Sequence, residues 1–352
     1  MAQHKLISRH KLLDPGTGHL AEAGYSNEYL LEYNKEAIKP GHRPKEWEYF
    51  LALTKDYGLG ITLAGVGVGS MFTVQLISFA GDWHICKSRM KPGDLGMPAN
   101  ITGSTFFEAG EDWCRYEKDG DSCRITFSMK EFGSGGSEIR GDVTFVTPKT
   151  DKMVLAVPYK DPELFYYNYK VNCMPVTGQV VYGEQVLLFG EAQAAVGTQD
   201  WGRGIWEPVN QWYWGSAGGW IGRKPFGFNI GHGFGDTSRA TENMVFYDGV
   251  CHKLEDVTFL IPGDKIGDLK LILPDENYMK PWKFVSGNHR LELDFTPVHD
   301  RQSGEQKGEY YCTQHQVFGL FNGRVVLDDG TVLEVKDLLG FAEKVGNDWR
   351  GL

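Results

Sequence analysis

Four dipeptides that favour tight turns constrain the fold of this chain more than any other feature. Each places Asp or Asn before Gly, between runs rich in β-branched and aromatic residues: Asp119-Gly120, Asp248-Gly249, Asn322-Gly323 and Asp329-Gly330. Such pairs supply the positive φ angles that two-residue hairpin loops require. Glycine makes up 45 of the 352 residues and aromatic residues make up 13%, which is typical of strands joined by tight turns. The sequence therefore predicts an all-β protein.

Individual strands can be placed from period-two patterns bounded by turn signals. They are expected at residues 122–129, 139–147, 177–190, 211–219, 241–247, 256–261 and 288–296, with a further hairpin around Asp329-Gly330. One short helix is predicted over residues 336–346, because Leu338, Leu339, Ala342 and Val345 recur at spacings of three and four residues.

Residues 59–80 contain no charged side chain and are long enough to cross a membrane as a helix. A β-hairpin is the alternative interpretation, and it is favoured because four glycines interrupt the segment and Phe72, Val74 and Leu76 alternate with polar residues. We therefore expect no stable membrane insertion. The N-terminus lacks the apolar run of a secretory signal, and the six cysteines show no regular spacing, so a reduced, cytoplasmic protein is expected.

The length suits about two domains, although one large all-β unit is an alternative. The most distinctive segment begins after the midpoint of the chain, so we place a boundary near residue 197, which gives units of residues 1–197 and 198–352. A net charge of −10 argues against a nucleic-acid partner. The sequence has no phosphate-binding glycine loop, no serine nucleophile motif and no metal-ligand spacing, so neither a cofactor nor a metal is expected.

The segment 197–220 holds half of the ten tryptophans, and its charged residues include Asp200 and Arg203. One interpretation is structural: the two side chains form a buried ion pair. The functional alternative is that apolar surroundings raise the pKa of Asp200, so that it remains a proton donor near neutral pH. The sequence leaves both interpretations open.

Other polar residues also allow two interpretations. Lys170 and Asn172 share one strand face with Asn168, and that face lines a cavity or faces solvent. Glu242 pairs structurally with Arg239 or Arg203, or it takes part in chemistry. His315 is the best general-base candidate among the ten histidines, although a lone histidine more often has a structural role; His232, between two glycines, is a weaker candidate.

Several separated motifs occur together in one order: DWGRGIW at 200–206, FGFNIGHGFGD at 226–236, TEN at 241–243, HQVFG at 315–319 and DLLGFAE at 337–343. With these motifs the chain resembles an uncharacterised bacterial family related to AttH-like and carotenoid hydratase-like proteins. The resemblance covers nearly the whole chain and is most specific from Tyr166 onward. It implies two lipocalin-like antiparallel β-barrels.

The resemblance also implies an activity. The related proteins include cofactor-free hydratases and cyclases, so we expect acid–base hydration, isomerisation or cyclisation of an apolar unsaturated molecule that is isoprenoid, polyketide or flavonoid-like. The hydratases place an acidic residue before Trp-Gly, and the closest match here is Asp200-Trp201-Gly202, which lacks an intervening Glu; a second acid has no obvious counterpart. Asp200 would then be the proton donor, Arg203 would orient it or stabilise negative charge, and His315 would act as a base.

A substrate would be bound by the aromatic and polar residues around these three. The expected binding residues are Trp201, Trp206, Trp212, Trp214, Lys170, Asn172, Asn229 and Glu242. A different class of function is also open, because small barrels commonly hold one apolar ligand: the protein would be a non-catalytic carrier of a lipid or pigment. A third alternative is a structural protein whose barrels are filled by side chains.

Overall fold

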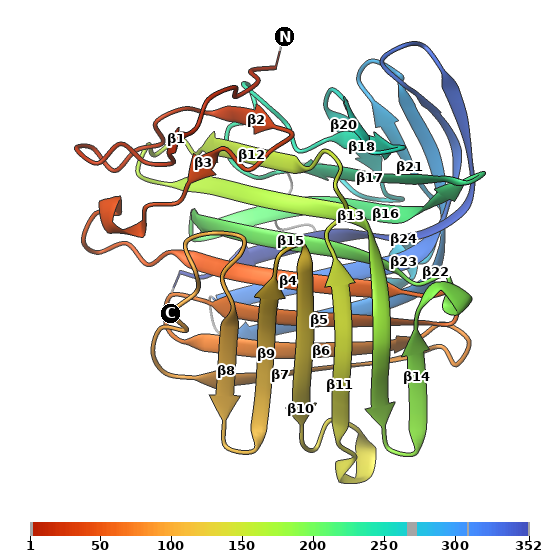
Figure 1. Cartoon of the computed structure of the whole chain (residues 1–352). Helices are drawn as coiled ribbons and strands as arrows, with labels where there is room; N and C mark the ends of the chain where they lie inside the picture. The colour runs from red at the N-terminus through yellow and green to blue at the C-terminus, as the bar shows by residue number, and fades with distance from the viewer. Residues whose placement is uncertain (1–2, 266–272, 308–309, 351–352) are drawn as a thin grey trace.

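The computed structural model describes residues 3–265, 273–307 and 310–350, and these residues are almost entirely β (Figure 1). The predicted fold class is confirmed: the strands form two large barrel-like sheets, one nearly closed and one a half-barrel. The helical elements of the described residues are short. They are η1 (Lys35–Ala37), η2 (Ser134–Gly136), η3 (Glu191–Gln193) and α1 (Asp275–Tyr278).

The first sheet forms the nearly closed barrel. Its strands are β2 (Gly24–Ser26), β4 (Lys45–Leu53), β5 (Tyr57–Gly65), β6 (Ser70–Ser78), β7 (Trp83–Lys91), β8 (Thr105–Ala109), β9 (Asp112–Asp119), β10 (Ser122–Met129), β11 (Ile139–Val146), β12 (Met153–Pro158), β13 (Phe165–Tyr182), β14 (Gln185–Phe189) and β15 (Val196–Ile205). The two short strands β1 (His10–Lys11) and β3 (Leu31–Glu32) pair with each other.

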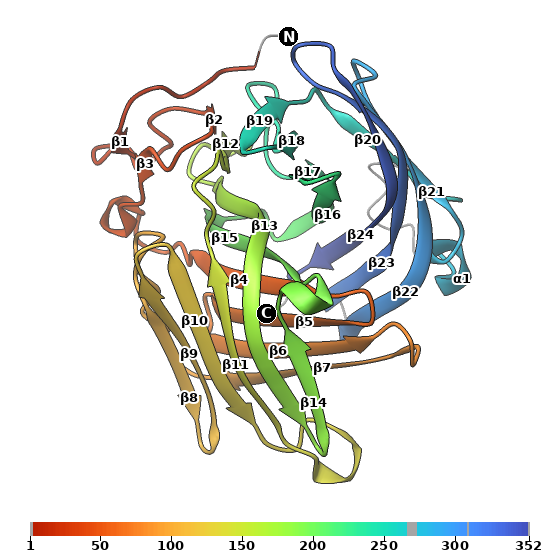
Figure 2. The same cartoon turned by 45° about the vertical axis from the view of Figure 1, so that its right-hand side comes forward.

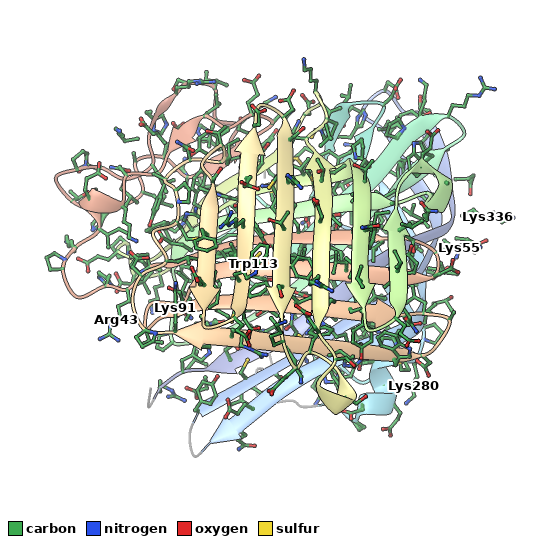
Figure 3. The ribbon with its side chains drawn as sticks, turned by 60° about the horizontal axis from the view of Figure 1, so that its bottom comes forward. Arg43, Lys55, Lys91, Trp113, Lys280 and Lys336 are labelled. Carbon is green, nitrogen blue, oxygen red and sulfur yellow. The ribbon has the colours of Figure 1, made fainter. Side chains whose placement is uncertain are left out.

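The barrel closes because its sheet folds over on itself. Strands β8 to β11 lie across β4 to β7 (Figure 3), and the edge strand β8 returns to the side of β6 and β7. β13 makes the corner: its first half pairs with β15, its second half pairs with β11, and a bulge with Cys173 at φ 55° lies between them. The interior is filled by apolar side chains that include Phe50, Phe72 and Phe127.

The second sheet is the half-barrel, and its long strands curve around a separate apolar core (Figure 2). Its strands are β16 (Val209–Ile221), β17 (Lys224–His232), β18 (Met244–Tyr247), β19 (Val250–Lys253), β20 (Val257–Leu260), β21 (Trp282–Ser286), β22 (Leu291–Lys307), β23 (Tyr310–Val326) and β24 (Val332–Asp348). The chain leaves the first sheet after Ile205 and enters the second at Val209. The division into units 1–197 and 198–352 stays a prediction.

The two sheets pack face to face, so that the central strands of both are buried on two sides. Tyr49 and Leu51 of β4 meet Trp214, Phe318 and Phe341 of the second sheet. Successive side chains of a strand point to opposite faces, so each of these strands sends one set of residues into its own barrel and the other set into the layer between the sheets. We call this buried layer the inter-sheet layer.

The uncharged segment 59–80 forms the hairpin of β5 and β6, as predicted. Among the described residues, no helix has the length and apolar character needed to span a membrane. Three of the four turn dipeptides also join neighbouring paired strands, at Gly120, Gly249 and Gly330. The fourth expectation was wrong: Asn322-Gly323 lies inside β23, where the pairing register with β24 shifts.

The predicted helix over residues 336–346 was also wrong, because this segment is part of β24. Leu333 and Val335 alternate inward as expected for a strand, but Asp337, with φ 48°, interrupts the alternation and the next buried residue is Leu338. Beyond it the strand is buried on both faces. The interruption and the two-sided burial together imitate the three- and four-residue spacing of a helix.

Candidate functional site

Asp200 lies in the middle of β15 and points into the inter-sheet layer. Its Oδ1 accepts hydrogen bonds from the Trp47 indole at 3.2 Å and from the Asn168 amide at 2.6 Å. Its Oδ2 lies 3.8 Å from the Lys170 ammonium. Trp47, Asn168 and Lys170 come from the two strands that flank β15, and strand pairing therefore places all three around this carboxyl.

Lys170 joins Asp200 to a second carboxyl, Glu242, which lies in the segment just before β18 of the other sheet. Its Nζ lies 2.8 Å from Glu242 Oε2, and the same oxygen accepts a 3.0 Å hydrogen bond from Asn229. The side-chain oxygen Oδ1 of Asn229 in turn accepts the Trp214 indole N–H at 2.7 Å, and Lys170 Nζ lies 3.9 Å from the centre of the Trp214 ring. The structure thus gathers five of the residues singled out in the sequence into one connected group, although Glu242 pairs with Lys170 rather than with either arginine.

Burial dominates the electrostatics of this group. It raises the pKa of Asp200, against the opposing effects of the Lys170 charge and the Asn168 hydrogen bond. Burial also raises the pKa of Glu343, a carboxyl on β24 that receives the Trp212 indole N–H at 2.8 Å and the Gln314 amide at 3.1 Å. Burial therefore shifts two carboxyls of the inter-sheet layer toward their neutral forms, compared with the same groups in water.

Sequence reasoning missed Glu343 because its segment was assigned to a helix that packs against a core. In the strand, Glu343 is the direct cross-strand neighbour of Trp214 and Gln316. Trp47 was also missed, since it lies outside the tryptophan-rich segment and reaches Asp200 only through the pairing of β4 with β15. A buried acid at an alternating position of a central strand was the signal that could have found Glu343.

Aromatic rings form a wall at one end of this group. Tyr166 stacks on Phe234 with ring centres 4.3 Å apart, and Trp212 stacks on the same Phe234 at 5.0 Å. Trp206 meets Trp47 edge-on at 5.1 Å. Three of the four predicted tryptophans, Trp206, Trp212 and Trp214, therefore lie in the inter-sheet layer.

The other two predicted members of the group lie on the opposite side of β15. Trp201 and Arg203 point into the first barrel, where the guanidinium lies 3.9 Å from the centre of the Trp201 ring and donates to the carbonyl oxygens of Trp47 and Pro98 at 3.1 and 2.7 Å. Asp200 and Arg203 are three residues apart, and an odd spacing on a strand places side chains on opposite faces. The expected ion pair between them was wrong. Arg203 instead has Glu46 as its carboxylate neighbour, at 4.0 Å.

Asn172 lies farther along β13, also between the sheets. Its amide donates to Ser216 Oγ at 2.7 Å and to the Phe228 carbonyl at 3.0 Å. It borders a cavity of about 40 Å³ together with Cys173 and Phe246, which is space for one water molecule. Of the two alternatives for this strand face, the solvated one was wrong: Asn168, Lys170 and Asn172 are all buried.

His315 lies away from Asp200, on the concave face of the half-barrel. Its Nδ1 is 2.7 Å from Asp300 Oδ2, and its ring stacks on Tyr278 with centres 3.6 Å apart. His232 is near the same face, with its ring centre 6.2 Å from that of Tyr213. Within the described ranges, no three His, Cys, Asp or Glu side chains are grouped so that they could hold a metal ion.

Comparisons with known proteins give one family and several distant structures, two of which are described here. None of the curated proteins matches the chain. Kievitone hydratase from Nectria haematococca is similar in structure, with a TM-score of 0.49 and 11% identity over 88% of this chain and 90% of that one. A candidate AttH protein from Nitrosomonas europaea has a TM-score of 0.47 and 13% identity over 87% of this chain and 93% of that one. The model of the family described as domain of unknown function DUF2804 matches residues 3–349, and the chain therefore belongs to that family.

Proposed function

We propose that the protein is a cofactor-free acid–base enzyme that hydrates, isomerises or cyclises an apolar unsaturated small molecule in the inter-sheet layer. The observation that carries the proposal is the state of Asp200, a buried carboxyl with a raised pKa beside a wall of aromatic rings. Asp200 is the proton donor of this reaction. The free thiols of all six cysteines suit a reducing compartment, and we place the enzyme in the cytoplasm.

The geometry fits proton donation from one oxygen of Asp200. Oδ1 accepts hydrogen bonds from two N–H groups, those of Trp47 and Asn168, so it acts as an acceptor and does not carry the proton. The acidic proton therefore belongs on Oδ2. Protonation of a carbon–carbon double bond needs an acid that keeps its proton until the substrate is in place, and a carboxyl whose pKa is raised by burial meets that requirement.

The surroundings also suit the positively charged intermediate that such a protonation creates. The faces of aromatic rings stabilise cations. The Lys170 ammonium already lies over such a face, 3.9 Å from the centre of the Trp214 ring. In hydration a water molecule adds to the cation, and in isomerisation or cyclisation a proton leaves it. In each case the carboxylate that the donation leaves on Asp200 accepts the released proton, which comes from the added water in hydration and from carbon in isomerisation or cyclisation.

The experiment begins with native mass spectrometry of protein purified from its own host, which identifies a co-purifying apolar compound. That compound is then incubated with the enzyme in D₂O, and the product is examined for deuterium bound to carbon. Wild-type protein should introduce deuterium, and Asp200→Asn should bind the compound but introduce none. Asp142→Asn is the matched control, because Asp142 pairs with Arg124 on the surface at 2.6 Å and should not matter.

Two results would contradict the proposal. If the Asp200→Asn variant introduces deuterium at the wild-type rate, Asp200 is not the proton donor. Wild-type protein that binds the compound and returns it unchanged, with no deuterium, is a carrier of a lipid or pigment and not an enzyme.

A further inference from the structure

A row of polar and titratable side chains crosses the concave face of the half-barrel, separate from the inter-sheet layer. Strand pairing places Tyr213 of β16 beside Lys344 of β24, and Lys344 beside His315 of β23. Neighbouring strands are about 4.8 Å apart, so the register places these three residues in one line across β16, β24 and β23, which lie side by side in Figure 2. The proposed function uses none of Tyr213, Lys344 and Asp264.

Asp264 closes over this row from the segment that follows β20. Its Oδ2 accepts the Tyr213 hydroxyl at 2.8 Å, and its Oδ1 receives the Lys344 ammonium and the Lys265 backbone N–H, the latter at 2.9 Å. The Asp264 and Lys344 side chains are only 2% and 8% exposed. A carboxylate oxygen can accept two hydrogen bonds, and among the residues that the structure describes Oδ2 receives one.

A cavity of about 390 Å³ adjoins Asp264, and its other described lining residues are the apolar Phe259, Leu260, Ile261 and Pro262. Phe259 packs on Tyr213, with ring centres 5.6 Å apart, so the cavity lies directly against the row. Small-molecule sites commonly have volumes of about 300–1,000 Å³, mostly apolar walls and a few polar groups that orient the ligand. This cavity has the same composition.

The charges around the row decide which polar group a ligand would carry. Asp264 and Asp300 supply two negative charges, Lys344 supplies one positive charge, and Lys344 is already engaged by Asp264. A carboxylate or phosphate head would meet Asp264 at the polar end of the cavity and be repelled. A group that donates a hydrogen bond would complete the vacant acceptor position on Oδ2.

We propose that this cavity is a second ligand site, which takes an apolar molecule ending in a hydroxyl group, with the hydroxyl donating to Asp264. The site is independent of the reaction proposed for the inter-sheet layer. Lys344 and Tyr213 hold the Asp264 carboxylate in position, and the residues Phe259 to Pro262 contact the apolar body of the ligand.

The test is a titration of the full chain with 1-decanol and, separately, with decanoate, followed by isothermal calorimetry. Decanol should bind saturably at one site, and decanoate at least about ten-fold more weakly, since it loses a hydrogen bond to a charged group and adds repulsion. Leu260→Trp fills the cavity and should weaken decanol binding at least about ten-fold. The matched control is Val250→Trp, because Val250 is 51% exposed and Leu260 is 49% exposed, but Val250 does not line the cavity.

Two further variants identify the site and the polar contact. Asp264→Asn should remove the preference for decanol over decanoate, and circular dichroism checks that both cavity variants are folded. Asp200→Asn should leave decanol binding unchanged, which separates this site from the inter-sheet layer. The proposal is overturned if decanol fails to saturate the wild type, if Leu260→Trp binds it as tightly as the wild type, or if decanoate binds equally well.

Discussion

Lys170 is the residue that holds the charges of the inter-sheet layer together. It lies 2.8 Å from Glu242 and 3.8 Å from Asp200, and it is almost fully buried. Lys170→Met should lower the free energy of unfolding by about 3–5 kcal/mol, because it leaves a buried carboxylate without its cation. Lys170→Met combined with Glu242→Gln should recover part of that loss. Denaturant unfolding checks both variants.

The control for this prediction is Lys224→Met, which removes an exposed pair with Asp248 and should cost no more than about 1 kcal/mol. Equal losses for Lys170→Met and Lys224→Met would contradict the account, since they would show that burial does not matter to the Lys170 contacts.

The raised pKa of Asp200 predicts how the stability of the protein changes with pH. Its pKa is raised in the folded protein by burial, so between its ordinary value of 3.8 and its folded value the folded state binds more protons than the unfolded state. The free energy of unfolding must then fall as pH rises through this window. Asp200→Asn removes this effect, so its stability relative to the wild type should increase from pH 4 to pH 8. An unchanged difference across that range would contradict the raised pKa.

Single residues were easier to find in the sequence than their partners. Asp200, Lys170, Asn229, Glu242 and Trp214 could be singled out from residue type and local pattern, and the structure connects them. Their mutual contacts could not be predicted, because they depend on the packing of two sheets whose strands are far apart in the sequence. The expected ion pair between Asp200 and Arg203 was wrong for a simpler reason. The two residues are close in sequence, but a spacing of three on a strand places their side chains on opposite faces.

At the scale of single elements, a substitution at the bulge in β23 tests whether Asn322-Gly323 lies inside this strand. Gly323 has a φ of 145°, and a Cβ there would lie 2.2 Å from the Glu292 carbonyl oxygen. Gly323→Ala should therefore lower the free energy of unfolding by at least about 2 kcal/mol. Gly330→Ala is the matched control, because Gly330 has a φ of 86° but open space around it, and it should cost about 1–2 kcal/mol.

If Gly330→Ala cost as much as Gly323→Ala, the close approach of β22 to β23 at this point would be wrong.

The same region shows which structural features a local sequence pattern can miss. Asn322-Gly323 has the composition of a hairpin turn, and residues 336–346 have the spacing of a helix, yet both lie in long strands at an irregularity. Bulges and two-sided burial arise from the curvature of the whole sheet, and a short sequence window does not contain them.

At the scale of the whole molecule, a pair of histidines bridges the two sheets. His84 of β7 lies 2.8 Å from His299 of β22, Nδ1 to Nε2, and His299 is also 2.9 Å from Asp82. Burial lowers the pKa of His84, and the neighbouring His299 and Arg301 lower it further, against the opposing charge of Asp300. The unfolded state therefore binds more protons than the folded state just below the ordinary value of 6.5.

The free energy of unfolding should consequently decrease as pH falls through 6.5. His84→Gln should flatten this part of the pH dependence, and urea unfolding at several pH values between 5 and 8 measures it. His19→Gln is the control, because His19 is part of the N-terminal segment before the first barrel. Equal slopes for the wild type and His84→Gln would contradict the role of the bridge.

The overall architecture was the most predictable feature of the chain. Turn dipeptides and alternation identified an all-β protein and many of its strands, since these signals depend on neighbours in the sequence. The presence of two barrel-like sheets was available only through the family resemblance, and their unequal closure and face-to-face packing were visible only in the structure. The inter-sheet layer that this packing creates is the basis of the proposed function.

The central claim is that Asp200 carries a proton that burial makes hard to remove. The most direct measurement is a pH titration of the carboxyl ¹³C signal of Asp200 in protein labelled at aspartate, with the signal assigned by its loss in Asp200→Asn. The account predicts a titration midpoint above the ordinary value of 3.8. A midpoint at or below that value would show an ionised carboxylate held by Lys170, and would contradict Asp200 as a proton donor.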